Sequence, residues 1–187
     1  MRGAILIIDM VKDVFDKEHG FPIMVHAKAI VPRVNEVNQW ARKKGWPVIF
    51  SCDSFLKEDF IFKGKMGPHA LRGTEGCMVT EELVQEPGDV YLPKRRFSGF
   101  FKTDLDQTLR TWEVDTVVVC GISTHFCVLT TAMDALCHDF KAIILEDATA
   151  AFTAEIHEKT LDLFRKNPLY PLFKIMTSEE LYQLGNE

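Results

Sequence analysis

The chain has 187 residues and a net charge of −5, with 47% hydrophobic and 26% charged residues. This length fits one domain, residues 1–187, and the composition is ordinary for a globular protein. The negative charge and the lack of a basic stripe argue against nucleic acid or an anionic membrane as the main partner. The two basic runs, 42–44 and 94–96, are too short to form a phosphate-binding patch.

The amino-terminal sequence MRGAILIIDM has an apolar run that is too short for a signal peptide. No stretch approaches the ~20 apolar residues of a membrane span. The five cysteines are odd in number and include no C-x-x-C pair, so we expect free thiols in a reducing compartment. These features predict a cytoplasmic protein that has no membrane partner.

Apolar runs and helical periodicity alternate along the chain. In chain order, the expected strands are Ala4–Asp9, Pro47–Cys52, Asp89–Leu92, Asp115–Cys120, Phe140–Leu145 and Leu172–Met176. The expected helices are Val31–Lys44, Met78–Glu86, Thr103–Trp112, Thr124–Cys137 and Thr153–Lys166, and a capping box at Thr177 and Glu180 begins a last one. This alternation predicts an α/β fold of three layers, with helices on both faces of a six-stranded, mostly parallel, Rossmann-like sheet.

Several chemically useful residues follow the predicted strands. Ligands of such sheets bind outside the carboxyl ends of the strands. Asp9, Asp53, Lys94 and the segment after Gly121 all lie just past strand ends, so we expect them to converge on one rim. The irregular segment 54–76, which has four glycines, is too long for a neutral connection and is expected to shape the site.

Cys127 lies six residues after Gly121, near the start of the helix that follows the fourth strand. A helix amino terminus lowers the pKa of a thiol and offers N–H groups to an oxyanion. The position alone leaves two interpretations open, a nucleophile or a buried structural thiol.

A cysteine nucleophile needs a base. His125 is only two residues from Cys127 and would face elsewhere on a helix, so Asp9 is the candidate. Lys94 could balance the aspartate and favour thiolate formation. The alternatives are a helix or turn cap for Asp9 and a solvated surface residue for Lys94.

Four ordered segments resemble the motifs of the isochorismatase-like cysteine hydrolases, a family that includes nicotinamidases, N-carbamoylsarcosine amidases and ureidoacrylate hydrolases. The segments are DMVKD (9–13), GPHALRGTEG (67–76), PKRRFSGF (93–100) and GISTHFCV (121–128), the last followed by TAMDA (131–135). The resemblance implies that family's fold and a catalytic triad of Asp9, Lys94 and Cys127. It also implies a thioester at Cys127, resolved by water that Asp9 activates. A non-proline cis peptide at Ile122–Ser123 would direct N–H groups at the oxyanion beside Cys127.

Departures from the family pattern bear on the metal. Nicotinamidases carry an Asp-x-His pair after the second strand and a further loop histidine, where this chain has Asp53, Phe55 and His69. Phenylalanine cannot bind a metal, and a catalytic zinc normally has three protein ligands. We therefore expect no required cofactor. A structural hydrogen-bonded pair is the preferred interpretation of Asp53 and His69, and a zinc ion between them is the alternative.

Other departures bear on the substrate. Val14 stands where nicotinamidases tend to have phenylalanine, and Met66 replaces an expected tryptophan, which argues against plain nicotinamidase activity. Aromatic residues could line an apolar pocket, pack a subunit interface or simply fill space. The candidate pocket residues are Phe15, Phe55, Met66, Phe97 and Phe126. The resemblance also implies a homo-oligomer, a dimer or tetramer, that acts on a small molecule.

The leading interpretation is hydrolysis of a small amide, ureido or carbamoyl compound. One alternative is nicotinamidase activity proper, and another is isochorismatase-type cleavage of a vinyl ether, which can dispense with a cysteine. A catalytically silent binding or assembly member is a third. A thiol redox protein is a fourth, weakened because no resolving cysteine lies near Cys127 in the sequence.

Overall fold

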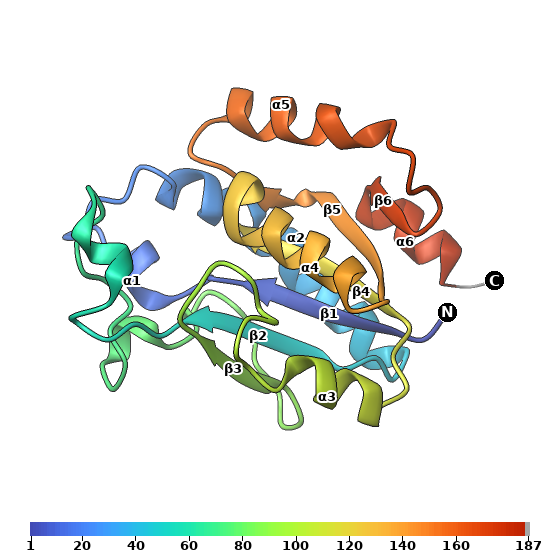
Figure 1. Cartoon of the computed structure of the whole chain (residues 1–187), viewed down its shortest axis with the longest axis horizontal. Coiled ribbons are helices and arrows are strands. Elements are labelled where there is room, and N and C mark those ends of the chain that lie inside the picture. The colour runs from blue at the N-terminus through green and yellow to red at the C-terminus, as the bar shows by residue number, and fades with distance from the viewer. Residues whose placement is uncertain (186–187) are drawn as a thin grey trace.

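The computed structural model describes residues 1–185, whose six strands form one sheet in the order β3-β2-β1-β4-β5-β6 (Figure 1). All neighbouring strands are parallel, so the predicted mostly parallel sheet is confirmed and is wholly parallel. The strands are β1 (Gly3–Ile8), β2 (Val48–Asp53), β3 (Val90–Lys94), β4 (Thr116–Ile122), β5 (Lys141–Ala150) and β6 (Phe173–Met176).

Helices cover both faces of the sheet, which confirms the three-layer α/β/α arrangement (Figure 1). One face packs against α1 (Lys12–Phe15), α2 (Met24–Lys43) and α6 (Ser178–Leu184). The other packs against α3 (Leu105–Thr111), α4 (Leu129–Cys137) and α5 (Ala154–Arg165). Within residues 1–185, none of these helices combines the length and the apolar character needed to cross a bilayer.

The apolar runs form strands because both of their faces are covered. In β1, Ile5 and Ile7 belong to one hydrophobic core, whereas Leu6 and Ile8 belong to the core on the opposite face. Alternate side chains of a strand point to opposite faces, so a strand covered on both sides must be apolar throughout. This is why the sequence pattern located the strands well.

Two predicted helices differ from the structure. No helix forms in the described chain over Met78–Glu86, because its start pairs with the segment after β1: Lys12 N–H donates to the Met78 carbonyl and Thr80 N–H to that of Met10. The helix expected from Val31 begins already at Met24 and passes through Pro32. The predicted capping box of α6 is confirmed, since the Thr177 and Glu180 side chains each bond the other residue's backbone N–H.

The strand order determines where a ligand can approach. From β1 the chain passes through β2 and β3 toward one edge, and then returns to place β4 on the other side of β1. The crossing connections therefore leave a crevice at the carboxyl ends of β1 and β4, the usual ligand position in open parallel sheets. Asp9 follows β1 and Cys127 follows β4 at this crevice.

Candidate active site

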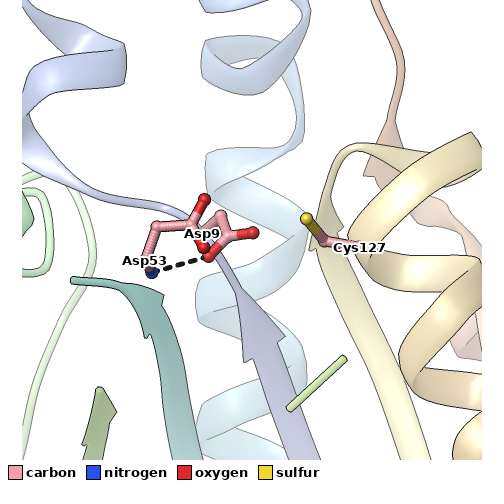
Figure 2. Close-up of side chains that lie close together, drawn as sticks. All are labelled: Asp9, Asp53 and Cys127. Carbon is pink, nitrogen blue, oxygen red and sulfur yellow. Dashed lines mark hydrogen bonds between the residues drawn. The ribbon is translucent and has the colours of Figure 1, made fainter. Parts of the chain in front are cut away.

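The structure brings together four residues that sequence analysis placed on one rim. Asp9 follows β1, Asp53 and Lys94 end β2 and β3, and Cys127 lies in the π-helix η3 (Thr124–Val128) after β4. The Cys127 sulfur and one carboxylate oxygen each of Asp9 and Asp53 lie within 4.8 Å of one another. Figure 2 shows the sulfur directed toward the two carboxylates.

Lys94 is the central cation of this site. Its ammonium donates to Asp9 Oδ2 at 2.9 Å and to Asp53 Oδ1 at 2.5 Å, and its side chain is wholly buried. The interpretation of Lys94 as a solvated surface residue is therefore wrong. Asp53 N–H donates to Asp9 Oδ1 at 2.8 Å, so both oxygens of Asp9 are held. A buried ammonium needs such partners, because burying an unpaired charge is costly.

The charges of this group are unbalanced. Two carboxylates share one ammonium, so the fully ionised group carries one excess negative charge. Burial and the charge of Asp9 raise the pKa of Asp53 to about 7, against the opposing effect of Lys94. Burial alone would lower the pKa of Lys94, but Asp53 and Asp9 outweigh it and raise that pKa well above its usual value. One shared proton makes the group neutral.

The pKa of the Cys127 thiol is shifted in the direction opposite to the one expected from the position of Cys127. Burial, and then the negative charge of Asp9, raise the pKa of its thiol well above the ordinary value, although Lys94 opposes this. The expectation of a thiol activated by a helix amino terminus is therefore wrong. The partial charge of a helix end, about half a unit, is weaker than full desolvation beside a carboxylate. The resting thiol is neutral and needs a base.

The backbone before Cys127 depends on a glycine. Gly121 has a φ of +98°, and a Cβ there would lie 2.3 Å from the Ile8 carbonyl oxygen, so only glycine fits where β4 runs against β1. The Ile122–Ser123 peptide bond is cis, as the family resemblance implied. Its role at an oxyanion stays a prediction.

A contact that sequence reasoning missed holds the start of the π-helix. The buried Thr124 hydroxyl lies 2.9 Å from Nδ1 of His157, on α5. Burial lowers the pKa of His157, which keeps the ring neutral. The two residues are far apart in the chain, and no local pattern pairs them. A π-helix is often found at functional sites.

The prediction that Asp53 and His69 form a hydrogen-bonded pair is wrong, since no such bond occurs among the described residues. Asp53 accepts from Lys94 instead, because a buried ammonium is the stronger donor. His69 Nδ1 lies 3.0 Å from the Gly67 carbonyl, and its ring packs on Phe55 at 5.5 Å between centroids. The Asp53 carboxylate is bound to Lys94, and the His69 ring packs on the aromatic ring of Phe55. These two residues therefore do not form a zinc site, which normally has three protein ligands.

The predicted pocket residues fall into separate groups. Phe97 stacks on Phe126, the residue before Cys127, at 5.8 Å between centroids, and both rings remain partly exposed. Phe55 is buried against His69, Phe15 packs on the hydrophobic core, and Met66 is exposed. An apolar cavity of about 440 Å³ adjoins Phe97 and is also lined by Phe101, Met133 and Cys137. Their role in binding substrate stays a prediction.

Comparisons with known proteins agree with this fold. The family model described as the isochorismatase domain matches residues 3–180. A protein of Arabidopsis thaliana named a probable inactive nicotinamidase is 34% identical, over 82% of this chain and 83% of its own length. The crystal structure of an isochorismatase-like hydrolase from Alkaliphilus metalliredigens has a TM-score of 0.85 and 32% identity, covering 98% of this chain and 99% of that one. N-carbamoylsarcosine amidase from Thermoplasma acidophilum has a TM-score of 0.83 and 32% identity, covering 96% and 98%.

Proposed function

Because this chain belongs to the isochorismatase family, we propose that it hydrolyses a C–N bond of a small amide, ureido or carbamoyl compound through a thioester at Cys127. Asp9 is the base in this proposal, and Lys94 assists. The observation that carries this proposal is that a thiol, a carboxylate and an ammonium group lie close together in a buried position at the crevice between β1 and β4. The similarity to an N-carbamoylsarcosine amidase supports the choice of bond.

The first step is attack on the substrate carbonyl. Asp9 takes the thiol proton of Cys127 as the sulfur forms a bond to the carbonyl carbon, and the C=O electron pair moves to the oxygen. Amide N–H groups at the start of the Cys127 helix stabilise this oxyanion. Proton transfer moves one negative charge from Asp9 to the sulfur, where the positive charge of Lys94 stabilises it.

Two further steps return the enzyme to its resting state. The oxyanion reforms C=O and the C–N bond breaks, while protonated Asp9 gives its proton to the leaving nitrogen. Asp9 then takes a proton from water, whose oxygen attacks the thioester. The C–S bond breaks, Cys127 recovers its proton from Asp9, and the acid product leaves.

Asp9 suits the role of base better than the nearest histidine does. His125 Nδ1 lies 3.4 Å from the Ser123 hydroxyl, and its ring packs on Phe126 and Phe152. Both Asp9 oxygens accept hydrogen bonds from donors of neighbouring strands, which orients the carboxylate toward the sulfur. Because the pKa of the Cys127 thiol is raised, proton transfer to this carboxylate must accompany attack.

The test is ammonia release from nicotinamide, N-carbamoylsarcosine, ureidoacrylate and biuret. Cys127→Ala should lower release by about three orders of magnitude or more, because the nucleophile is lost. Cys77→Ala, which removes a free thiol that lies outside the apolar cavity and the catalytic group, is the matched control and should retain activity.

Two results would contradict the proposal. Undiminished release by Cys127→Ala would exclude the thioester. No release from any compound by the wild-type protein would favour a catalytically silent member, which the name of the Arabidopsis relative suggests for that protein. Release from nicotinamide alone would favour nicotinamidase activity proper.

A further inference from the structure

A second ionic cluster lies next to the proposed catalytic group, on the residues that follow Lys94. It borders a cavity of about 330 Å³, which we name the cationic cavity. The cavity is lined by Arg72, by Pro93 to Arg96 and by Phe101 to Thr103. Its volume lies at the lower end of the range of small-molecule sites, and three separate segments of the chain form its wall.

The lining of the cationic cavity is strongly positive. It includes Arg72, Arg95, Arg96 and Lys102, and none of its lining residues within 1–185 is acidic. The nearby carboxylate is Asp59, which is buried and accepts from Arg95 Nε at 3.1 Å and from Arg96 Nη1 at 3.4 Å. Four cations therefore line the cavity, and two of them bond the carboxylate of Asp59, in a chain whose net charge is −5.

The guanidinium groups are held in place before any ligand binds. Asp59 accepts two bonds from Arg95, through Nε and Nη2. Arg72 Nε donates to the buried Ser54 hydroxyl at 3.1 Å. A guanidinium has five N–H donors, and these bonds use only some of them. Fixed guanidinium groups suit the paired oxygens of carboxylates and phosphates.

The cationic cavity is distinct from the proposed catalytic group. The Lys94 side chain is wholly buried and its ammonium faces Asp9 and Asp53, so the cavity does not reach that ammonium. Phe101, about half exposed, adds an apolar wall, and the Lys102 ammonium lies 5.4 Å from its ring centroid. A ligand here would meet guanidinium donors on one side and an aromatic ring on the other.

We propose that the cationic cavity binds a small anion that offers at least two carboxylate or phosphate oxygens to the arginines. This anion is either the charged end of the substrate or a separate ligand, and both present the same chemistry to the arginines. The inference does not rest on the proposed hydrolysis, since binding can be measured on a protein that cannot turn over.

The test is isothermal titration of malonate, and separately of inorganic phosphate, into the Cys127→Ala protein at low salt. Malonamide, which has the shape of malonate without its charge, is the control ligand. At least one anion should bind while malonamide does not, and added salt should weaken the binding. Equal heats from malonate and malonamide, or no binding by either anion, would overturn the proposal.

Variants localise the site. Arg72→Gln and Lys102→Gln, each made in the Cys127→Ala protein, should raise the Kd of the bound anion by about tenfold. Lys174→Gln is the matched control, because Lys174 makes the same kind of contact as Lys102, 5.6 Å from the Tyr170 ring centroid, outside the cavity. If all three variants weaken binding equally, the anion binds by net charge and the cavity is not its site. Circular dichroism checks that each variant is folded.

A competition experiment identifies the source of the anion. If an amide substrate is found, malonate that raises its KM in the wild-type protein without changing kcat assigns the cavity to the substrate's charged end. Malonate that binds Cys127→Ala with the same Kd at saturating substrate assigns it to a separate ligand. Both results support the anion site, whereas its failure in the titration leaves the proposed hydrolysis untouched.

Discussion

Two neighbouring ion clusters use consecutive residues of the chain in opposite ways. Lys94 ends β3 and shares its single charge between the buried carboxylates of Asp9 and Asp53. Arg95 and Arg96, which follow directly, both bond one carboxylate, that of Asp59. The first cluster has an excess of carboxylate around a wholly buried ammonium, whereas the second has an excess of cation, and its guanidinium groups are partly exposed at a cavity.

The two aspartates show what this difference does. Burial and the charge of Asp9 raise the pKa of Asp53 to about 7. Hydrogen bonds from Arg95, aided by the Leu56 N–H, instead lower the pKa of Asp59 well below its usual value. The residue type is the same and both side chains are largely shielded from solvent, so the ratio of cations to carboxylates decides the direction. The charged partners of an aspartate, and not its residue type, therefore determine how its pKa is shifted.

Removing one cation from each cluster should give the largest difference in stability between the two clusters. Lys94→Met leaves two buried carboxylates without their ammonium, and should lower the free energy of unfolding by about 3–5 kcal/mol. Arg95→Met should lower it far less, because Arg95 is well exposed and Arg96 and the Leu56 N–H still bond Asp59. Urea unfolding at pH 8, above the pKa of about 7 of Asp53 in the wild-type protein, measures both. Equal losses would show that the two clusters do not differ in the way described.

The pH dependence of stability should have opposite signs at the two aspartates. Asp53 binds its proton more tightly in the folded state, so its contribution is complete below about pH 4 and is lost as the pH rises to about 7, by at most about 1.4 kcal/mol per pH unit. Asp59 has a lowered pKa, so its contribution is present above about pH 4 and is lost as the pH falls below that value.

Asparagine variants separate the two contributions. Asp53→Asn should flatten the decline in unfolding free energy between pH 4 and 7, and Asp59→Asn should reduce the loss below pH 4. Denaturant unfolding across this range gives the slopes. The same change of slope in both variants would remove the distinction between the clusters.

The smallest expected effect concerns an uncharged contact on the other side of Cys127. The Thr124 hydroxyl lies 2.9 Å from Nδ1 of His157, and burial lowers the pKa of this ring, so a neutral ring can accept the hydroxyl proton at Nδ1. His157→Leu should loosen the start of the π-helix and lower kcat by about tenfold, with KM nearly unchanged. His157→Gln, which can donate and accept, should restore most of the activity.

The positioning of Cys127 by His157 can also be measured without turnover. The rate of Cys127 alkylation by iodoacetamide should change in His157→Leu and return in His157→Gln, whereas a purely structural role would alter only the melting temperature. Acid should mimic the leucine variant, because protonation removes the acceptor at Nδ1 as the pH falls below the usual range of histidine. Wild-type kcat and alkylation in His157→Leu would exclude this role.

The sequence alone determined the fold class and the approximate position of the site. Apolar runs located the strands because strands covered on both faces must be apolar, and Thr177 with Glu180 located the start of α6 because a capping box is local. Ligands of open parallel sheets bind at the carboxyl ends of the strands, and this rule predicted that Asp9, Lys94 and Cys127 lie on one rim although no distance was known.

Only the tertiary structure decided which groups pair and in which direction they titrate. The partner of Asp53 is Lys94 and not His69, the pKa of the Cys127 thiol is raised and not lowered, and the segment at Met78 pairs with the chain after β1 instead of forming a helix. Each outcome depends on burial or on a charge contributed by a distant segment. Local patterns report neither quantity, since both arise when separate strands and loops meet in space.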